Sequence, residues 1–139
     1  MQRPGIWFWI VGGLAVLWNG FGLYDMLMTV TADEAYLAEF TEEQVAYWVE
    51  LPAWRFVLWA GGAGLALLGS LLFLLRRAAA VPLLAVAPIA MVIGLIADGI
   101  GGGLAIYGIG GVAASLVVLG IAIFFVWYAA RQRRLGILR

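Results

Sequence analysis

The sequence predicts an all-α integral membrane protein, a bundle of four transmembrane helices with both termini on one side of the bilayer. Two observations are compositional: 65% of the 139 residues are hydrophobic, and only 12% are charged. The third is the spacing of the charges, which leaves four apolar stretches near the roughly 20 residues that a helix needs to cross a membrane. We therefore expect a single transmembrane domain over residues 1–139.

The first span is expected at about residues 6–28. One arginine, Arg3, precedes this apolar stretch, as in a signal peptide. The stretch is longer than the core of a signal peptide, opens with Trp7-Phe8-Trp9 and contains no small-residue cleavage site. The sequence therefore predicts a retained helix.

An acidic connection is expected at residues 31–51, after the first span. Thr31 with Glu34, and Thr41 with Gln44, both fit the capping-box pattern, which predicts two short helices there. The second should be amphipathic and rest on the outer membrane surface. The connection is interpreted as a solvated outer loop; the alternatives are a docking face for a cationic partner or a weak divalent-ion site, although its spacing matches no calcium loop.

Three further spans complete the prediction. One covers about residues 52–75 and is closed by Arg76-Arg77. The next covers about 81–103 and starts with Pro82, which the first turn of a helix tolerates because no partner is needed there for the missing N–H. The last covers about 111–130 and is followed by a basic tail.

The arginines predict the orientation of the bundle. Seven of the eight lie on one face of a four-span arrangement, and the positive-inside rule places that face, with both termini, in the cytoplasm. Arg55 is the exception. Six acids lie in the outer connection, and Asp25 and Asp98 are expected near the outer ends of their helices. The seven arginines are Arg3, Arg76, Arg77, Arg131, Arg133, Arg134 and Arg139.

Small residues recur at intervals of four in the last three spans. In lipid, where no hydrophobic drive brings helices together, such positions allow the close approach that holds a bundle or an oligomer. The residues predicted to pack helices in this way are Gly62, Ala66, Ser70, Ala90, Gly94, Gly102, Gly111 and Ser115.

A few polar residues interrupt the apolar spans. Asp98 is interpreted as a carboxylate that is solvated or paired with Arg55, because an unpaired charge at membrane depth is costly. Asn19, about 20 Å along its helix, is expected to form an interhelical hydrogen bond. The alternative joins Asn19, Tyr24, Asp25, Arg55 and Asp98 into a polar intramembrane cluster that opens to the outside.

Composition limits the available chemistry. The chain contains no Cys and no His, and all eight basic residues are Arg, so thiolate, imidazole and lysine catalysts and the usual zinc ligands are excluded. The glycine run ending in Gly103 lacks the lysine of a phosphate-binding loop. We expect no catalytic residues, no metal, no cofactor and no nucleic-acid partner; a lipid-acting enzyme would require Asp25 and Asp98 to lie within about 5 Å of each other.

Several short segments of the first 90 residues resemble a group of small bacterial inner-membrane proteins of unknown function, some of which carry the label "sugar transporter". The resemblance implies a multi-pass protein of the bacterial inner membrane. It is carried by Trp18-Asn19 with Gly22, Pro52-Ala53-Trp54, Gly69-Ser70-Leu71-Leu72 followed by Arg76-Arg77, and Ala80-Val81-Pro82-Leu83-Leu84.

Two classes of function fit these patterns. The preferred one is non-enzymatic: a bundle that acts through helix packing, as a homo-oligomer or as an accessory subunit of a larger membrane assembly. The alternative is a small-solute transporter or channel with an outer polar vestibule. A cavity that reaches Asn19 would favour the second class, and a closed bundle with paired polar residues would favour the first.

Overall fold

The computed structural model describes residues 3–139, which contain helices and no strands. Met1 and Gln2, part of the predicted domain, lie outside the described residues. The four long helices have the length and hydropathy needed to cross a membrane, so the predicted all-α fold with four spans is confirmed and the chain is a multi-pass membrane protein. In chain order the helices are α1 (Ile6–Val30), α2 (Glu34–Leu37), α3 (Glu42–Val49), α4 (Ala53–Leu74), α5 (Ala80–Gly101) and α6 (Gly103–Arg134).

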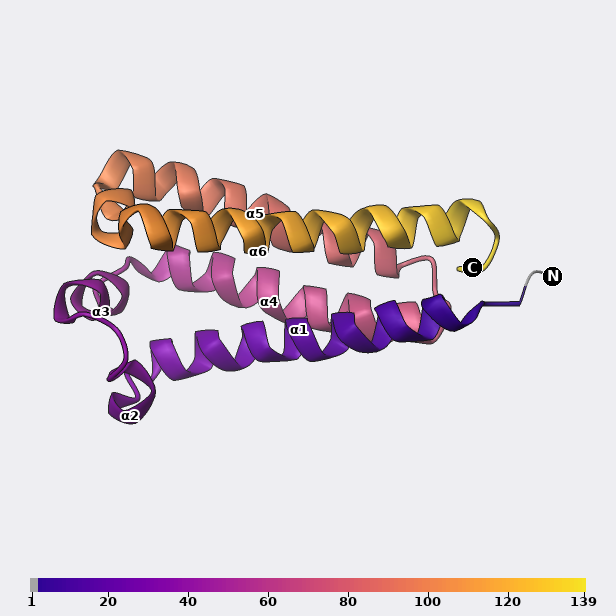
Figure 1. Ribbon diagram of the computed structural model, residues 1–139, viewed down its shortest axis with the longest axis horizontal. Coiled ribbons are helices and arrows are strands. Elements are labelled where there is room, and N and C mark those ends of the chain that lie inside the picture. Colours follow the sequence, from indigo (N-terminus) through magenta and orange to yellow (C-terminus); the bar gives the residue numbers. More distant parts are fainter. Residues whose placement is uncertain (1–2) are drawn as a thin grey trace.

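The long helices run side by side, and the two short ones lie together at one end of the bundle (Figure 1). We call this end, which carries the acidic residues of α2 and α3 and of the loops beside them, the acidic end. The opposite end, where both termini lie, is the terminal end (Figure 1). It carries Arg3, the pair after α4 and the arginines of the last turn of α6, so charge is segregated along the long axis.

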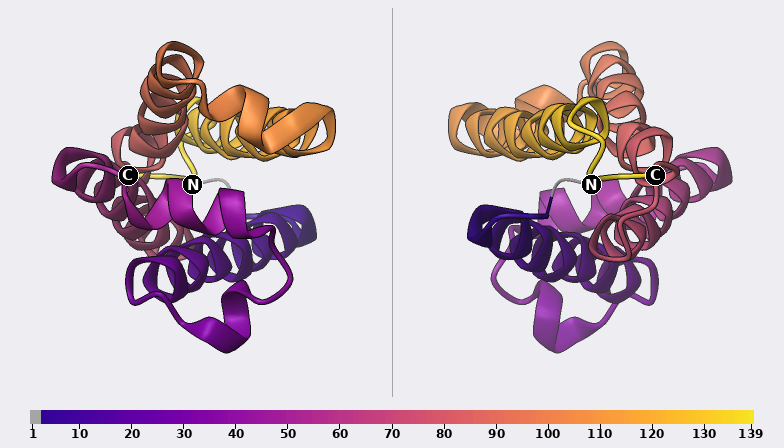
Figure 2. Two further views of the ribbon diagram at one scale, coloured as in Figure 1. Left: turned by 90° about the vertical axis from the view of Figure 1, so that its left-hand side faces the viewer. Right: turned by 90° about the vertical axis from the view of Figure 1, so that its right-hand side faces the viewer.

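The long helices form an incomplete ring. Helix α4 packs against both α1 and α5, and α6 packs against α5 and, at the acidic end, against α3. There is no comparable packing between α1 and α6, which face each other across one side of the bundle (Figure 2). The ring is therefore open between its first and last helices.

Local capping explains the two short helices. Thr41 and Gln44 form the predicted capping box at the start of α3, each side chain bonding to the backbone of the other residue. At α2 the prediction that Thr31 is the cap is wrong: the Asp33 carboxylate caps the helix by accepting from the Tyr36 N–H. Thr31 instead closes α1, because its hydroxyl donates to the Leu27 carbonyl.

Glycines bring α4 and α5 into close contact. Gly62 faces Ala90, and a Cβ atom added at Gly62 would lie 3.1 Å from the Ala90 Cβ. Two turns further on, Gly69 lies against the backbone of α5, where an added Cβ would be 2.9 Å from the Leu84 nitrogen. Ala66, between them, is 1% exposed. This seam is the small-residue packing that membrane helices require.

The junction of α5 and α6 differs from the prediction. Gly102 does not pack against a neighbouring helix: it is exposed and ends α5 in the left-handed conformation, with φ 81°, which favours glycine. Helix α6 then begins at Gly103 instead of near Gly111, and continues past the predicted residue 130 to Arg134. A break at Gly108 (φ 66°, ψ −178°) separates its first turn from the rest.

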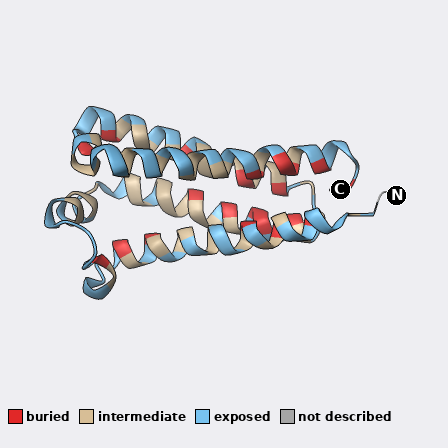
Figure 3. Cartoon of the chain, in the orientation of Figure 1, coloured by how far each residue is buried: buried red, intermediate tan, exposed pale blue. Residues whose placement is uncertain are grey.

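Most of the apolar core lies toward the terminal end of the bundle (Figure 3). Phe8 of α1 stacks on Phe73 of α4, with ring centroids 4.4 Å apart, and Tyr128 of α6 packs beside them. The last residues fold back over this core: the Ala78 N–H donates to the Arg139 carbonyl, and the Arg139 N–H donates to Arg76. Side chains thus fill the space between the four long helices at the terminal end of the bundle.

Candidate functional site

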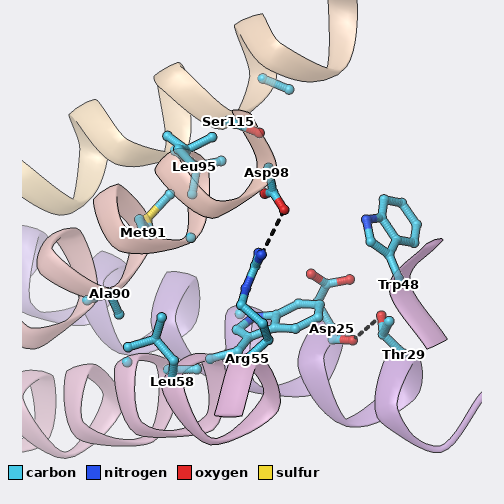
Figure 4. A pocket seen from close by; sticks show the side chains of 18 of the residues that line it. Asp25, Thr29, Trp48, Arg55, Leu58, Ala90, Met91, Leu95, Asp98 and Ser115 are labelled. Carbon is cyan, nitrogen blue, oxygen red and sulfur yellow. Dashed lines mark hydrogen bonds and ion pairs between the residues drawn. The ribbon is translucent and has the colours of Figure 1, made fainter. Parts of the chain in front are cut away.

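The open ring encloses a cavity of about 510 Å³ in the half of the bundle nearer the acidic end. All four long helices contribute to its wall, and residues of α3 and its neighbouring loops line the end that faces away from the termini. Four of the five predicted polar residues line it, namely Asn19, Asp25, Arg55 and Asp98. Figure 4 shows the last three converging with Trp48 and Ser115 on one space.

An ion pair between α4 and α5 dominates the polar part of this cavity. The Arg55 Nη1 atom lies 2.9 Å from Asp98 Oδ1, with 11% and 6% of the two side chains exposed (Figure 4). Gly94, one turn before Asp98, leaves room for the arginine: an added Cβ would lie 3.6 Å from Arg55 Nη2. The glycine predicted to pack helices therefore faces a side chain that crosses from α4 to α5.

Two tyrosines complete the shell around Asp98. The Tyr47 hydroxyl of α3 donates to Oδ1 at 2.8 Å, and the Tyr107 hydroxyl of α6 donates to Oδ2 at 3.0 Å. One carboxylate thus joins α3, α4, α5 and α6. Charge-assisted bonds of this kind offset part of the cost of burying the charge, so Asp98 organises the acidic end of the bundle.

Tyr47 also fixes α3 against the start of α6. Its ring lies directly over Gly103, where a Cβ atom would be 2.5 Å from Tyr47 Cζ. Burial, reinforced by the Asp98 carboxylate, raises the pKa of the Tyr47 hydroxyl, so this group stays protonated and keeps donating. Helix α3 is therefore held as a cover over the end of the cavity.

Asp25 of α1 has a different environment. Its Oδ1 atom accepts a 2.6 Å hydrogen bond from the Tyr36 hydroxyl of α2. Among residues 3–139 the ion pair between Arg55 and Asp98 is the one salt bridge, so Asp25 has no cationic partner there. Tyr24 does not line the cavity; it is 48% exposed and contacts the Tyr36 ring edge-on.

The pKa of the Tyr36 hydroxyl should reveal its hydrogen bond to Asp25. Burial, together with the bond to Asp25, raises the pKa of Tyr36 to about 12. The folded-state pKa lies above the ordinary value of 10.0. The contribution of the protonated Tyr36 hydroxyl to the stability of the fold is therefore complete below pH 10 and is lost as the pH rises toward 12. Absorbance titration of phenolate formation, with Tyr36→Phe subtracted, should give a midpoint near this value; in Asp25→Asn the midpoint should fall. An unchanged midpoint in Asp25→Asn would contradict this.

Asn19 forms the predicted interhelical hydrogen bond. Its Nδ2 atom donates to the Ser70 hydroxyl of α4 at 2.8 Å, and Ser70 donates in turn to the Ala66 carbonyl. Ser70 is fully buried. Ser70, predicted to pack helices, therefore also satisfies a polar group at membrane depth, and Asn19 lines the cavity on the α1 side.

A double-mutant cycle between Asn19→Ala and Ser70→Ala measures this bond. We expect a coupling of about 0.6 kcal/mol, with an upper limit near 1.7 kcal/mol, as for other hydrogen bonds between membrane helices. Ser115→Ala is the matched control, because the Ser115 hydroxyl bonds to the Gly111 carbonyl of its own helix. Strictly additive free energies of unfolding for Asn19→Ala and Ser70→Ala would contradict the assignment.

The remaining packing residues divide into two groups. Those of the α4–α5 seam and its α1 face, Gly62, Ala66, Ser70 and Ala90, are buried between helices. Gly111 and Ser115 are less buried and line the cavity from α6, together with Ala114, Val118 and Ala122, while Gly62 and Ala90 line it from the α4–α5 seam. Because these α6 side chains are small, they do not fill the space between α6 and α1, and this space is part of the cavity.

The lining changes character with depth. Near the acidic end it includes the polar groups described above with Thr29 and Gln44; toward the middle of the bundle it is formed by Leu58, Met91 and Leu95 and by small residues. Beyond this the core around Phe73 and Leu84 fills the ring. The cavity is therefore amphipathic and ends before the terminal end of the bundle.

Sequence reasoning missed three tyrosines and the aromatic lining. Tyr36, Tyr47 and Tyr107 supply the hydroxyl donors to both carboxylates, and Trp18, Trp48, Trp59 and Phe40 line the cavity. The available signal was the frequency of aromatic residues in the acidic connection, which contains Tyr36, Phe40, Tyr47 and Trp48.

The two carboxylates of the cavity belong to separate hydrogen-bond networks. Asp25 bonds to Tyr36 of α2, whereas Asp98 pairs with Arg55 of α4. Within residues 3–139 no cluster of metal-ligating side chains occurs. Comparison of the chain with protein-family models, curated proteins and solved structures gives no match.

Proposed function

We propose that this chain is a membrane protein that binds a small solute in the cavity. This corresponds to the second class of function, in which an outer polar vestibule receives the solute. The observation that carries the proposal is a cavity of about 510 Å³ that contains Asn19, Asp25, Arg55 and Asp98 and ends against an apolar core. Ligand sites in membrane and soluble proteins share this form, a largely apolar space with a few convergent polar groups. The site has the volume of a drug-sized ligand.

The terminal end of the bundle is closed, which fits a binding site better than an open channel. A channel needs a continuous path, whereas here Phe8, Phe73 and Tyr128 fill the ring below the cavity. A transporter built on this chain would have to part these side chains while α3 covers the acidic end. The geometry therefore supports a one-sided binding state more directly than an open pore.

We further propose that the acidic end faces the outside and the terminal end the cytoplasm of a bacterial inner membrane. The positive-inside rule supports the orientation, since seven of the eight arginines lie at the terminal end. The resemblance of the first 90 residues to small bacterial inner-membrane proteins supports the location. The cavity would then admit solutes from the outer leaflet or the space beyond it.

Chemical modification of single cysteines tests the binding cavity, since the chain has no natural cysteine. In proteoliposomes, Ser115→Cys should react much faster with a membrane-impermeant methanethiosulfonate added from the acidic end than Val117→Cys. Ser115 lines the cavity, whereas Val117 is 61% exposed on the apolar surface of the same helix, and a thiolate forms readily only where water reaches it. Equal, slow reaction of both cysteines would contradict the proposal.

The interaction class remains a second candidate, favoured by the exposure of α6. Only 6% of the apolar part of this helix is buried, the smallest share among the four spans, and α1 does not cover it. A second copy of this chain or another membrane subunit would cover that side in an assembly. Native mass spectrometry from lipid nanodiscs should then show more than one copy or a second protein; a lone monomer would remove this candidate.

A further inference from the structure

We infer that the cavity selects cationic amphipathic molecules, in which a substituted ammonium group is joined to an apolar body. This inference rests on the proposed function, because it names the class of ligand that the cavity would take. Four features support it: the charge balance of the lining, its aromatic residues, its apolar depth and the field at the acidic end.

The lining has an unbalanced negative charge. It contains two carboxylates, Asp25 and Asp98, and one guanidinium, Arg55. The ion pair neutralises Arg55 and Asp98 with respect to each other. Asp25 has only the Tyr36 hydroxyl as a side-chain partner among the described residues, so its negative charge is available to a ligand. An anion would meet this carboxylate and an arginine that is already paired.

Aromatic rings surround the same space. Trp18, Trp48, Trp59, Phe40 and Tyr107 all line the cavity. The faces of aromatic rings attract cations, Trp most strongly, and more so where water is excluded. Ser115 already donates its hydroxyl proton to the Gly111 carbonyl, and one amide proton of Asn19 is bonded to Ser70. A sugar or another neutral polar solute would need many hydrogen-bond partners, whereas apolar and aromatic side chains make up most of the lining.

The deeper lining and the open side fit an apolar body. Leu58, Met91, Leu95 and Val118 provide an apolar surface beyond the polar groups. Because α1 and α6 do not pack together, the cavity wall is incomplete on the side that faces the apolar membrane. A molecule that partitions into the bilayer could then enter sideways, with its charged group directed toward Asp25.

Charge at the acidic end strengthens the selection. All eight acids of the chain and one of its eight arginines belong to this end, an excess of seven negative charges. A field of one sign around a cavity raises the local concentration of ligands of the opposite charge. It also disfavours the phosphate of an ordinary phospholipid headgroup, so the occupant should be a cation without a phosphate.

A set of three probes with one shared body tests the inference. The probes are phenylpropyl-trimethylammonium, its neutral isostere with tert-butyl in place of trimethylammonium, and phenylpropyl sulfonate. Binding is measured by calorimetry and tryptophan quenching with the full chain in nanodiscs that contain no choline lipid, and empty nanodiscs are subtracted. We expect the cation to bind at least about tenfold more tightly than either other probe.

Two matched variants test the role of Asp25. Asp25→Asn keeps an oxygen that can accept from Tyr36 but removes the charge, and it should weaken binding of the cation about tenfold while leaving the neutral isostere unchanged. Glu39→Gln removes the same charge from an exposed residue that does not line the cavity and should change neither. Equal losses in the two variants would overturn the assignment of Asp25.

The outcomes separate the inference from the proposed function. If the neutral or anionic probe binds as tightly as the cation, the inference of cation selection is wrong and a binding cavity remains. If no probe binds above empty nanodiscs although Ser115→Cys is modified from the acidic end, cation selection is again wrong. If Ser115→Cys is also unreactive, the proposed function itself fails.

Discussion

Replacing Arg55 with methionine is expected to lower the free energy of unfolding by about 3–5 kcal/mol, the usual cost of breaking a buried ion pair. The substitution keeps most of the apolar stem but leaves the carboxylate of Asp98, whose side chain is only 6% exposed, without its cation. The hydroxyls of Tyr47 and Tyr107 would remain and cannot neutralise the charge. Denaturation in mixed micelles, followed by the loss of helical circular dichroism, measures the change.

A second substitution should reverse most of this loss. In Arg55→Met with Asp98→Asn the stranded charge is gone, and the amide can still accept from a tyrosine. Arg77→Met is the control, because Arg77 is exposed at the terminal end, and should stay within about 0.5 kcal/mol of the natural protein. If Arg55→Met were as mild as Arg77→Met, the ion pair would not stabilise the acidic end.

Among substitutions that add a single methyl group to α4, Gly69→Ala is expected to lower the free energy of unfolding most. Its Cβ would lie 2.9 Å from the Leu84 backbone nitrogen, which cannot move without separating α4 from α5. We expect a loss of about 1–3 kcal/mol in the free energy of unfolding, as for other overpacked sites.

Gly64→Ala on the same helix is the matched control. Nothing lies within 4 Å of a Cβ built there, so the change should be neutral or stabilise the helix by up to about 1 kcal/mol through propensity alone. Similar stabilities for Gly69→Ala and Gly64→Ala would contradict the close α4–α5 contact.

The helices could be predicted from the sequence because their causes are local. Apolar length defines a span, and the Thr41 capping box defines the start of α3. Helix α6 was predicted too short because its first turn, Gly103 to Tyr107, is brief and lies between Gly102 and Gly108, both with positive φ. Propensity argues against such a helix, whereas Tyr107 is held there by Asp98.

The site could be predicted only in part. Polar residues are rare in an apolar chain, so Asn19, Asp25, Arg55 and Asp98 stood out. The pairing of Asp98 with Arg55 could be proposed from charge, whereas Ser70 was predicted as a packing residue and not as the partner of Asn19. The cavity itself has no sequence signature. It exists because α6 presents small residues toward α1 without packing on it, which depends on the angles between helices and on no local pattern.

The central claim, an amphipathic cavity bounded by α6, is tested most directly by spin labels placed along that helix. Labels at Ala114, Val118 and Ala122 line the cavity, whereas Ala113, Val117 and Phe124 are exposed outside it. Power-saturation measurements should show higher collision rates with a water-soluble nickel chelate at the first three positions and with oxygen at the others, because oxygen concentrates in lipid. A uniform, oxygen-dominated profile along α6 would contradict the cavity.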